Sequence, residues 1–330
     1  MRDGGVVARA LVLAFVALTA ACVPRTQELG VEMRLPAIER VEENGAAADR
    51  YVTRDGMKLG LAHWDAAMPS AVIVALHGMN DYSNAFAMPA PWWADHGIST
   101  YAYDQRGFGR SPQTGIWPGG PLMRRDLADF VDAVRMRHPN VPVFVLGESM
   151  GGAVAMTAFA SDMPPKADGL ILVAPAVWGR DTMPLSYRLA LWATAHTIPW
   201  TSFSGSGLRI TPSDNIEMLR AIGRDPLFLK RSRTDAIYGL VSLMGEAYAA
   251  APRLNGKPVL YLYGNRDEII PKRPTEAVAN QLKSDATLMT YPTGYHMLLR
   301  DLNAEPRWAD VAAWIENKAR RDADMMMAAQ

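Results

Sequence analysis

Apolar, strand-like runs alternate with helix-like segments along most of this chain, and this alternation restricts the fold more than any other feature. The runs lie at residues 71–76, 98–103, 143–146, 170–174, 259–263 and 287–291. Long apolar runs are typical of strands that are covered on both faces. Between the runs, apolar residues recur at helical spacing, as at Leu127, Val131 and Val134. The pattern predicts an α/β fold with a mostly parallel sheet and helices on both faces.

The alternation stops between residues 177 and 251. This segment contains apolar helical stretches at 187–195 and 236–248 but no strand pattern. We interpret it as a helical cap inserted between two strands of the sheet. The predicted division is a core of residues 50–176 and 252–318, a cap of residues 177–251, a tether of residues 22–49 and a frayed tail of residues 319–330.

Residues 1–21 are similar to a lipoprotein-type signal peptide, with early arginines, an apolar run and small residues before Cys22. The apolar run is shorter than the roughly 20 residues of a membrane span. Cys22 is the only cysteine, and we expect it to be lipidated after cleavage. Val23 favours the outer membrane of a bacterial cell envelope. The alternative is a plain secretory signal, which would give a periplasmic or secreted protein.

Charge and motif content exclude several classes of function. Lys+Arg and Asp+Glu both number 34, so the chain lacks the basic excess that favours a nucleic-acid partner. The sequence has no H-E-x-x-H motif and no Cys/His cluster, so we expect no metal site. The glycine-containing segment from Asp104 to Ser111 lacks the Gly-Lys-Ser/Thr ending of a phosphate-binding loop. We therefore interpret that segment as a structural loop.

A serine interrupts the buried pattern at Gly147-Glu-Ser149-Met-Gly151, between an apolar run and a helical segment. This G-x-S-x-G pattern is typical of a nucleophile elbow, a strand–turn–helix unit that exposes a serine hydroxyl at a sheet edge. Glycines suit its flanks because the strained turn leaves no room for side chains. We predict that Ser149 is a nucleophile. The alternative is a tight turn with a helix-capping serine.

A nucleophilic serine needs a base, and the base needs an acid that orients it. In elbow-containing folds these residues follow the serine in the order acid, then histidine. His296 follows the elbow near a strand end and is the predicted base. Asp267, which follows the run at 259–263, is the predicted acid. Glu268 and, more remotely, Asp181 are the alternatives.

The negative charge that develops on a carbonyl oxygen needs hydrogen-bond donors. One predicted donor is the backbone N–H of Met150, immediately after the nucleophile. The other is the N–H of Met79 in the loop that follows residues 71–76, where Gly78 lets the backbone approach. Met79 and Met150 therefore form the predicted oxyanion hole.

Several of these motifs occur together in one known superfamily. The residues concerned are His77-Gly78, Asp104 with Arg106-Gly107-x-Gly109-x-Ser111, Gly147-x-Ser149-Met-Gly-Gly152, Asp225-Pro226-Leu227, Gly264-x-x-Asp267 with Pro271, and His296. Over residues 50–318 the chain resembles the α/β-hydrolases, most of all the monoacylglycerol lipase and lysophospholipase branch of serine aminopeptidase S33 type. The resemblance implies an eight-stranded core, a mobile cap over an acyl groove and no cofactor. Glu148 stands where that branch often has histidine.

The leading hypothesis is a lipid-anchored serine esterase that cleaves single-chain lipid esters through an acyl-enzyme. Apolar cap residues could shelter the acyl chain, with Trp192, Trp200, Leu240 and Met244 as candidates. One alternative is an aminopeptidase-like amidase, which would need acidic residues near the site to hold an ammonium group; Glu148, Glu217 and Glu246 are the candidates. Another alternative is a non-catalytic envelope lipoprotein that binds lipid.

Overall fold

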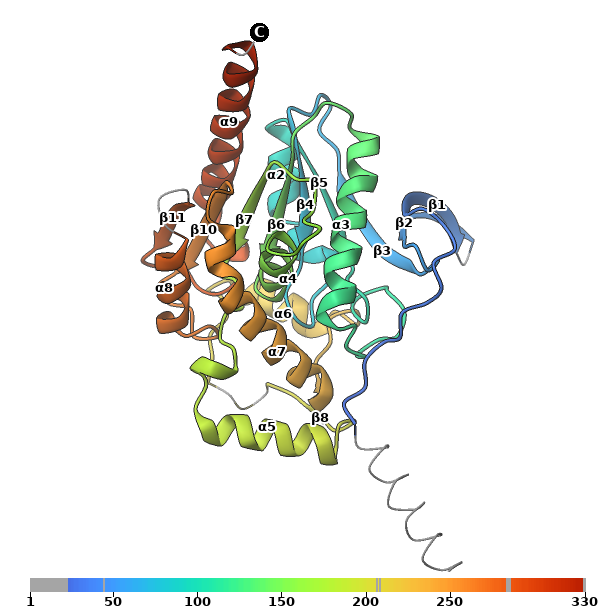
Figure 1. Cartoon of the computed structure of the whole chain (residues 1–330), viewed down its shortest axis with the longest axis vertical. Helices are drawn as coiled ribbons and strands as arrows, with labels where there is room; N and C mark the ends of the chain where they lie inside the picture. Colours follow the sequence, from blue (N-terminus) through green and yellow to red (C-terminus); the bar gives the residue numbers. More distant parts are fainter. Residues whose placement is uncertain (1–22, 44, 206, 208, 283–285, 329–330) are drawn as a thin grey trace, which may run out of the picture.

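The computed structural model describes residues 23–43, 45–205, 207, 209–282 and 286–328, and a single central sheet organises them (Figure 1). The strand order is β1-β2-β3-β5-β4-β6-β7-β10-β11. These strands are β1 (Ala37–Glu43), β2 (Ala46–Val52), β3 (Lys58–Trp64), β4 (Ala71–Leu76), β5 (Ile98–Tyr103), β6 (Val143–Glu148), β7 (Gly169–Val173), β10 (Val259–Gly264) and β11 (Ala286–Tyr291). From β5 to β11 all neighbours are parallel, whereas β1, β2 and β3 are antiparallel additions. The predicted mostly parallel sheet is confirmed.

Helices cover both faces of this sheet. The helices are α2 (Pro89–Asp95), α3 (Gly120–Arg137), α4 (Met150–Phe159), α5 (Leu185–Thr197), α6 (Ile216–Arg224), α7 (Thr234–Ala250), α8 (Lys272–Gln281) and α9 (Glu305–Ala328). Alternate residues of a strand face opposite sides. In β4, Val72 and Val74 belong to the apolar cluster that contains α3, α4 and α8 residues. Ile73 belongs to the cluster on the other face, with residues of α2 and α9. Each central strand is therefore buried on both sides.

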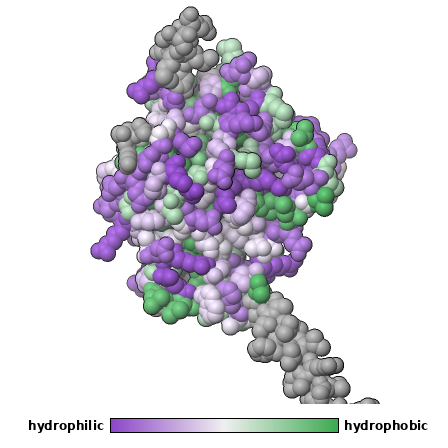
Figure 2. Space-filling view, in the orientation of Figure 1, coloured by the Kyte–Doolittle hydropathy of each residue, from purple (hydrophilic) through white to green (hydrophobic). Residues whose placement is uncertain are grey.

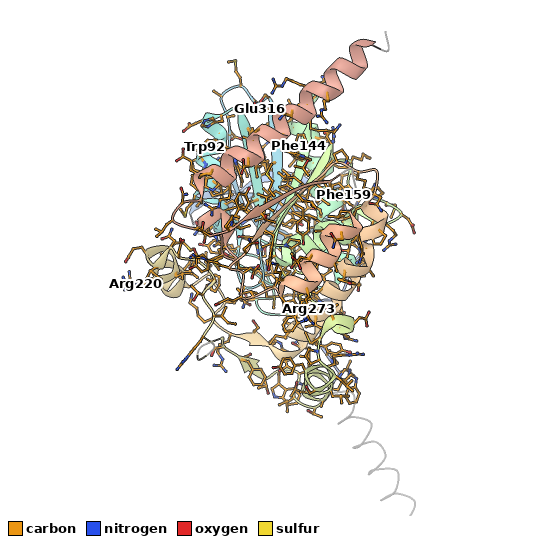
Figure 3. The ribbon with its side chains drawn as sticks, turned by 90° about the vertical axis from the view of Figure 1, so that its left-hand side faces the viewer. Trp92, Phe144, Phe159, Arg220, Arg273 and Glu316 are labelled. Carbon is orange, nitrogen blue, oxygen red and sulfur yellow. The ribbon has the colours of Figure 1, made fainter. Side chains whose placement is uncertain are left out.

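Aromatic packing fixes α9 against the sheet. Trp314 of α9 meets Phe144 of β6 edge to face, with ring centroids 5.7 Å apart. Figure 3 shows α9 running past the position of Phe144. The helix then continues out of the body at the end opposite α5 (Figure 1).

Three details differ from the sequence-based expectations. The sheet has nine strands rather than eight, because residues 37–43 of the predicted tether form β1 and pair with β2. The tail that was expected to be frayed, residues 319–330, is helical as far as Ala328, where α9 ends; its helical part contains no glycine or proline. In the segment expected to lack strands, β8 (Ser202–Phe203) and β9 (Ser232–Arg233) form a short antiparallel pair.

The segment between β7 and β10 contains α5, α6 and α7. Helix α7 is the connection that a parallel β7–β10 pair requires; its Ala247 and Ala250 are buried in the main apolar cluster. By contrast, α6 buries no residue and α5 buries only Ala195. Figure 3 shows Arg220 of α6 projecting away from the body. The domain boundaries themselves stay a prediction.

Candidate active site

Ser149 occupies a strained turn between β6 and α4. Its φ of 52° and ψ of −115° lie in a region that a residue with a side chain rarely adopts. The surrounding backbone holds it there: Ser149 N–H donates to the carbonyl of Val173, and the Ser149 carbonyl accepts from Ala153 and Ala176. Its neighbours Glu148 and Met150 are buried while Ser149 is partly exposed. This is the elbow geometry that the sequence predicted.

The glycines of the elbow are required by close contacts. A Cβ on Gly147 would lie 2.5 Å from the carbonyl oxygen of Gly151, and one on Gly151 would lie 2.2 Å from the carbonyl oxygen of Leu76. A Cβ on Gly152 would meet Pro175 at 2.8 Å. Because the obstacles to Gly147 and Gly151 are backbone atoms, side chains at these positions would force the elbow apart.

The structure brings His296 and Asp267 together at the carboxyl edge of the sheet. His296 Nδ1 lies 2.7 Å from Asp267 Oδ2, and both side chains are almost fully buried. The other carboxylate oxygen, Asp267 Oδ1, accepts the backbone N–H groups of Ile269 and Ile270. These bonds fix the carboxylate, which in turn orients the imidazole.

The two alternative acids lie elsewhere. Glu268 accepts the backbone N–H of Thr211 at the surface, and Asp181 is exposed in a short 3-10 helix. The structure therefore pairs His296 with Asp267 and with neither rival.

Ser149 and His296 line one cavity of about 650 Å³. Among the described residues no hydrogen bond joins the Ser149 hydroxyl to the imidazole. Such bonds are often long in ligand-free sites and shorten when substrate binds. Proton transfer between these side chains would therefore require them to approach each other.

The predicted oxyanion donors flank Ser149. A Cβ on Gly78 would lie 3.3 Å from Ser149 Cβ, so the loop of residues 78–82, the oxyanion loop, passes directly beside the nucleophile. Within the described chain, the N–H groups of Met79 and Met150 donate no hydrogen bond. Met150 is also the first residue of α4, where the helix leaves N–H groups free to bind an anion.

His77 holds the start of the oxyanion loop to the loop after β5. Its Nε2 accepts the backbone N–H of Gln105, so the ring proton is on Nδ1, which donates to the Gly78 carbonyl. Burial lowers the pKa of His77 and favours this neutral form. Its task is therefore structural.

Apolar side chains form most of the cavity wall. They come from the core and from the segment between β7 and β10: Ala176, Trp178, Met183, Leu191, Phe228, Ile237, Leu240, Val241, Met244, Ile269 and Ile270. Two of the predicted acyl-chain residues, Leu240 and Met244, line this cavity; their contact with an acyl chain stays a prediction. The prediction for Trp192 and Trp200 is wrong, because neither residue lines the cavity and their side chains are 55% and 54% exposed. Leu191 lines the cavity, and the ring of its neighbour Trp192 stacks on His196 of the same helix.

A charged cluster that the sequence analysis did not recognise forms the polar end of the cavity. Arg300 Nη1 lies 2.8 Å from Asp81 Oδ2, and Arg300 Nη2 lies 3.3 Å from Glu148 Oε2. All three residues are buried and line the cavity. Glu148 Oε1 and Arg300 Nε have no hydrogen-bond partner among the described residues. The sequence pointed to this cluster only through Glu148, which stands where related proteins often have histidine. Asp81 and Arg300 lie far from Glu148 in sequence.

Burial governs the titration of this cluster. It raises the pKa of Glu148, and the nearby Arg300 offsets this only in part. For Arg300, burial acts to lower the pKa, but the carboxylates of Asp81 and Glu148 outweigh it and raise the pKa. The polar end of the cavity therefore holds the carboxyl groups of Asp81 and Glu148 beside the Arg300 guanidinium.

The glycine-containing loop after β5 makes internal contacts. Arg106 is buried between Asp55 and Asp126, with its nearest ion pair, to Asp126, at 2.6 Å. These bonds tie the β2–β3 turn to α3, as expected of a structural loop. Within the described ranges, no three His, Cys, Asp or Glu side chains gather as metal ligands would.

Comparisons with known proteins identify the family. Residues 67–303 match the family described as serine aminopeptidase, S33. A monoacylglycerol lipase of Mycolicibacterium smegmatis is 28% identical over 75% of this chain and 88% of its own. The human monoglyceride lipase is 26% identical over 76% of this chain and 84% of its own.

Solved structures show the same fold. The monoacylglycerol lipase of Paleococcus ferrophilus superposes with a TM-score of 0.65 at 23% identity, covering 79% of this chain and 100% of its own. A carboxyl esterase of Bacillus coagulans gives a TM-score of 0.68 at 18% identity, covering 86% of this chain and 99% of its own. Together with the family match, these likenesses show that the chain belongs to the serine aminopeptidase S33 family of α/β-hydrolases, as an ester hydrolase of its monoglyceride lipase-like branch.

Proposed function

We propose that this protein hydrolyses the carboxylic ester of a single-chain lipid through an acyl-enzyme on Ser149. The observation that carries the proposal is one cavity, mostly apolar, into which both the elbow serine and the Asp267-bound His296 open. A nucleophile, a base and an apolar binding space are what such a reaction needs.

In the proposed mechanism, His296 Nε2 takes the proton of the Ser149 hydroxyl as the oxygen attacks the ester carbonyl. Asp267 stabilises the imidazolium through Nδ1. The N–H groups of Met79 and Met150 bind the tetrahedral oxyanion. His296 then gives its proton to the departing alcohol, leaving an acyl-enzyme. Water, activated by the same histidine, releases the fatty acid and restores Ser149.

The polar end of the cavity favours one lipid class over another. The Arg300 guanidinium is already paired with the carboxyl groups of both Asp81 and Glu148. It is therefore not free to pair with an anionic phosphate, whereas carboxyl oxygens such as Glu148 Oε1, which has no hydrogen-bond partner among the described residues, can accept from hydroxyl groups. We therefore place monoacylglycerol ahead of lysophospholipid as the substrate. Relatives named monoacylglycerol lipase and monoglyceride lipase support this choice.

An aminopeptidase-like amidase receives less support. Of the three acids that could hold an ammonium group, Glu217 is exposed and paired with Arg220, and Glu246 pairs with Arg124. Glu148 alone lines the cavity, and Arg300 already neutralises part of its charge.

We further propose that a lipid at Cys22 anchors the protein to the bacterial envelope, with the outer membrane as the expected location. Cys22 lies outside the described residues. The start of the described chain, drawn in blue, lies at the same end of the molecule as α5 (Figure 1), and the backbone N–H of Arg25 donates to Asp235 at the start of α7. Within the described residues no helix is long and apolar enough to span a membrane.

The surface near this end suits contact with lipid. Hydrophobic surface appears over α5 (Figure 2), where Leu185, Tyr187, Leu189 and Trp192 are exposed. Exposed aromatic and aliphatic side chains of this kind favour membrane interfaces. A lipid at residue 22 would bring this face toward the membrane. Replacing Cys22 with alanine should release the protein from the membrane fraction, and equal retention would contradict the anchor.

A fluorophosphonate probe tests the catalytic proposal. Wild-type protein should be labelled and Ser149→Ala should not. Absence of label on active wild type, or equal label on the variant, would overturn the role of Ser149. A panel of monoacylglycerols, lysophospholipids, p-nitrophenyl esters and amino-acid anilides then tests the substrate. Cleavage of anilides alone would replace the esterase proposal with the amidase.

A further inference from the structure

The oxyanion loop is held from two sides, by the core and by the segment between β7 and β10. On the core side, Gly78 packs against Ser149. On the other side, the carbonyl of Asn80 accepts the backbone N–H of Leu229 at 2.9 Å. The side-chain oxygen of Asn80 accepts the Ser232 hydroxyl at 2.9 Å. Both partners of Asn80 therefore come from residues 225–232, which we call the clamp segment.

A third bond ties the clamp segment to the end of the oxyanion loop. The Tyr82 hydroxyl donates to Asp225 Oδ2 at 2.7 Å. The other oxygen of Asp225 accepts the backbone N–H of Leu227, so the carboxylate is fixed within its own segment. This contact accounts for the Asp225-Pro226-Leu227 motif, which lies far from Ser149 in sequence.

Asn80 also has an unusual backbone conformation. Its φ is +69°, a left-handed value that asparagine tolerates better than most residues. Such a conformation persists where surrounding bonds hold it, and the clamp segment supplies two of those bonds. Asn80 directly follows Met79, so a change in its backbone angles would turn the Met79 N–H relative to Ser149.

We propose that the clamp segment positions the Met79 N–H for the oxyanion, so that the cap is part of the catalytic geometry as well as a wall of the cavity. This inference rests on the proposed ester hydrolysis through Ser149. Tyr82, Asp225 and Ser232 are positioning residues in this scheme, because they act through Asn80 and the loop. A displacement of about 1 Å in a catalytic group can cost about 100-fold in rate.

The test compares two serine-to-alanine changes in the same region. Ser232→Ala removes the bond to Asn80, and the double variant with Tyr82→Phe also removes the bond to Asp225. Ser242→Ala is the matched control, because its hydroxyl accepts from Arg180 within the cap and does not contact the oxyanion loop. Ser232→Thr keeps a hydroxyl and should restore activity. Rates are measured with a soluble ester that the wild type hydrolyses.

We expect kcat to fall about tenfold for Ser232→Ala and about 100-fold for the double variant, with KM unchanged, because the lost interaction belongs to the transition state. A single oxyanion donor is worth about 100- to 1000-fold, which sets the upper limit. Affinity for a trifluoromethyl ketone, which forms a tetrahedral adduct, should fall by the same factor. Affinity for a non-hydrolysable ether analogue should not change.

Two results would overturn the proposal. One is a double variant with the kcat and ketone affinity of Ser242→Ala. The other is a rise in KM with weaker ether binding and unchanged kcat, which would mean that the clamp segment only shapes the cavity. Since both results require an active wild type that labels at Ser149, they are distinct from a failure of the proposed function.

Discussion

The two walls of the cavity differ in how firmly their residues are held. On the sheet side, Ser149 is fixed by backbone hydrogen bonds and by glycines that touch backbone atoms, and Asp267 accepts three hydrogen bonds. On the cap side, α5, whose Leu191 lines the cavity, buries one residue, and α6, which lies outside the cavity wall, buries none. Elements with few buried contacts open more readily than a packed core. The groups that need fixed geometry lie on the rigid wall, and the acyl chain would meet the looser one.

The largest effect is expected on the sheet side of the cavity, at Asp267. Asp267→Asn should lower kcat about 10,000-fold, because an amide cannot hold the imidazole in the same tautomer or stabilise its cation. Steady-state kinetics on a soluble ester measure the effect. Glu268→Gln, one residue away, is the control and should keep wild-type kcat. Similar losses in both variants would show that the surface carboxylate matters as much as the buried one.

Two glycine-to-alanine changes compare the packing of α4, beside Ser149, with that of α6 in the cap. Gly151→Ala should lower the free energy of unfolding by about 2–3 kcal/mol or prevent folding, because its Cβ would lie 2.2 Å from the Leu76 carbonyl oxygen. Gly223→Ala in α6 meets no atom within 4 Å and should stabilise by up to about 1 kcal/mol, through helix propensity alone. Urea unfolding measures both. Equal destabilisation would mean that α6 is packed as tightly as α4.

Substrate length should be sensitive to the cap side of the cavity, where Leu240 of α7 lines the wall. Leu240→Ala enlarges the cavity beside Ser149 and should lower kcat/KM about tenfold for long-chain p-nitrophenyl esters, with little change for acetate esters. Leu189→Ala removes the same atoms from a side chain that is 60% exposed and should leave the chain-length profile unchanged. A flat profile in Leu240→Ala would place the acyl chain elsewhere.

The smallest expected effect concerns the polar end of the cavity. Burial raises the pKa of Glu148 above its ordinary value of 4.5, so the folded protein holds this proton more tightly than the unfolded chain. The resulting stability is present below that value and is lost as pH rises through the folded pKa. Glu148→Gln has no such proton, so its stability relative to wild type should rise with pH.

Urea unfolding of both proteins between about pH 4 and about pH 7 measures this difference. Glu217→Gln, on the exposed α6, provides the surface comparison. If the stability difference between Glu148→Gln and wild type does not change with pH, Glu148 is not a buried carboxyl group with a raised pKa.

The sequence predicted the rigid wall well. Each strand run, the elbow and the positions of Asp267 and His296 follow local patterns, because buried strands and tight turns impose strict residue requirements. The looser wall was predicted less well. Helical spacing identified an apolar helix at α5 but could not tell which face pointed inward, so Trp192 was assigned to the cavity in place of Leu191. The Asp81–Arg300–Glu148 cluster depends on three distant segments meeting, which no local pattern reveals.

Helix α7 has a consequence for engineering this scaffold. It is the crossover between two parallel strands, with Ala247 and Ala250 packed in the core, yet Leu240 and Met244 of the same helix line the cavity. A chimera that exchanged the whole cap would remove this crossover and unfold the host. A donor segment should instead end before Thr234, where α7 begins. It would also have to replace the hydrogen bonds that Asn80 and Tyr82 now make with the clamp segment. Chimeras that lack those hydrogen bonds should fold and bind lipid but hydrolyse the ester slowly.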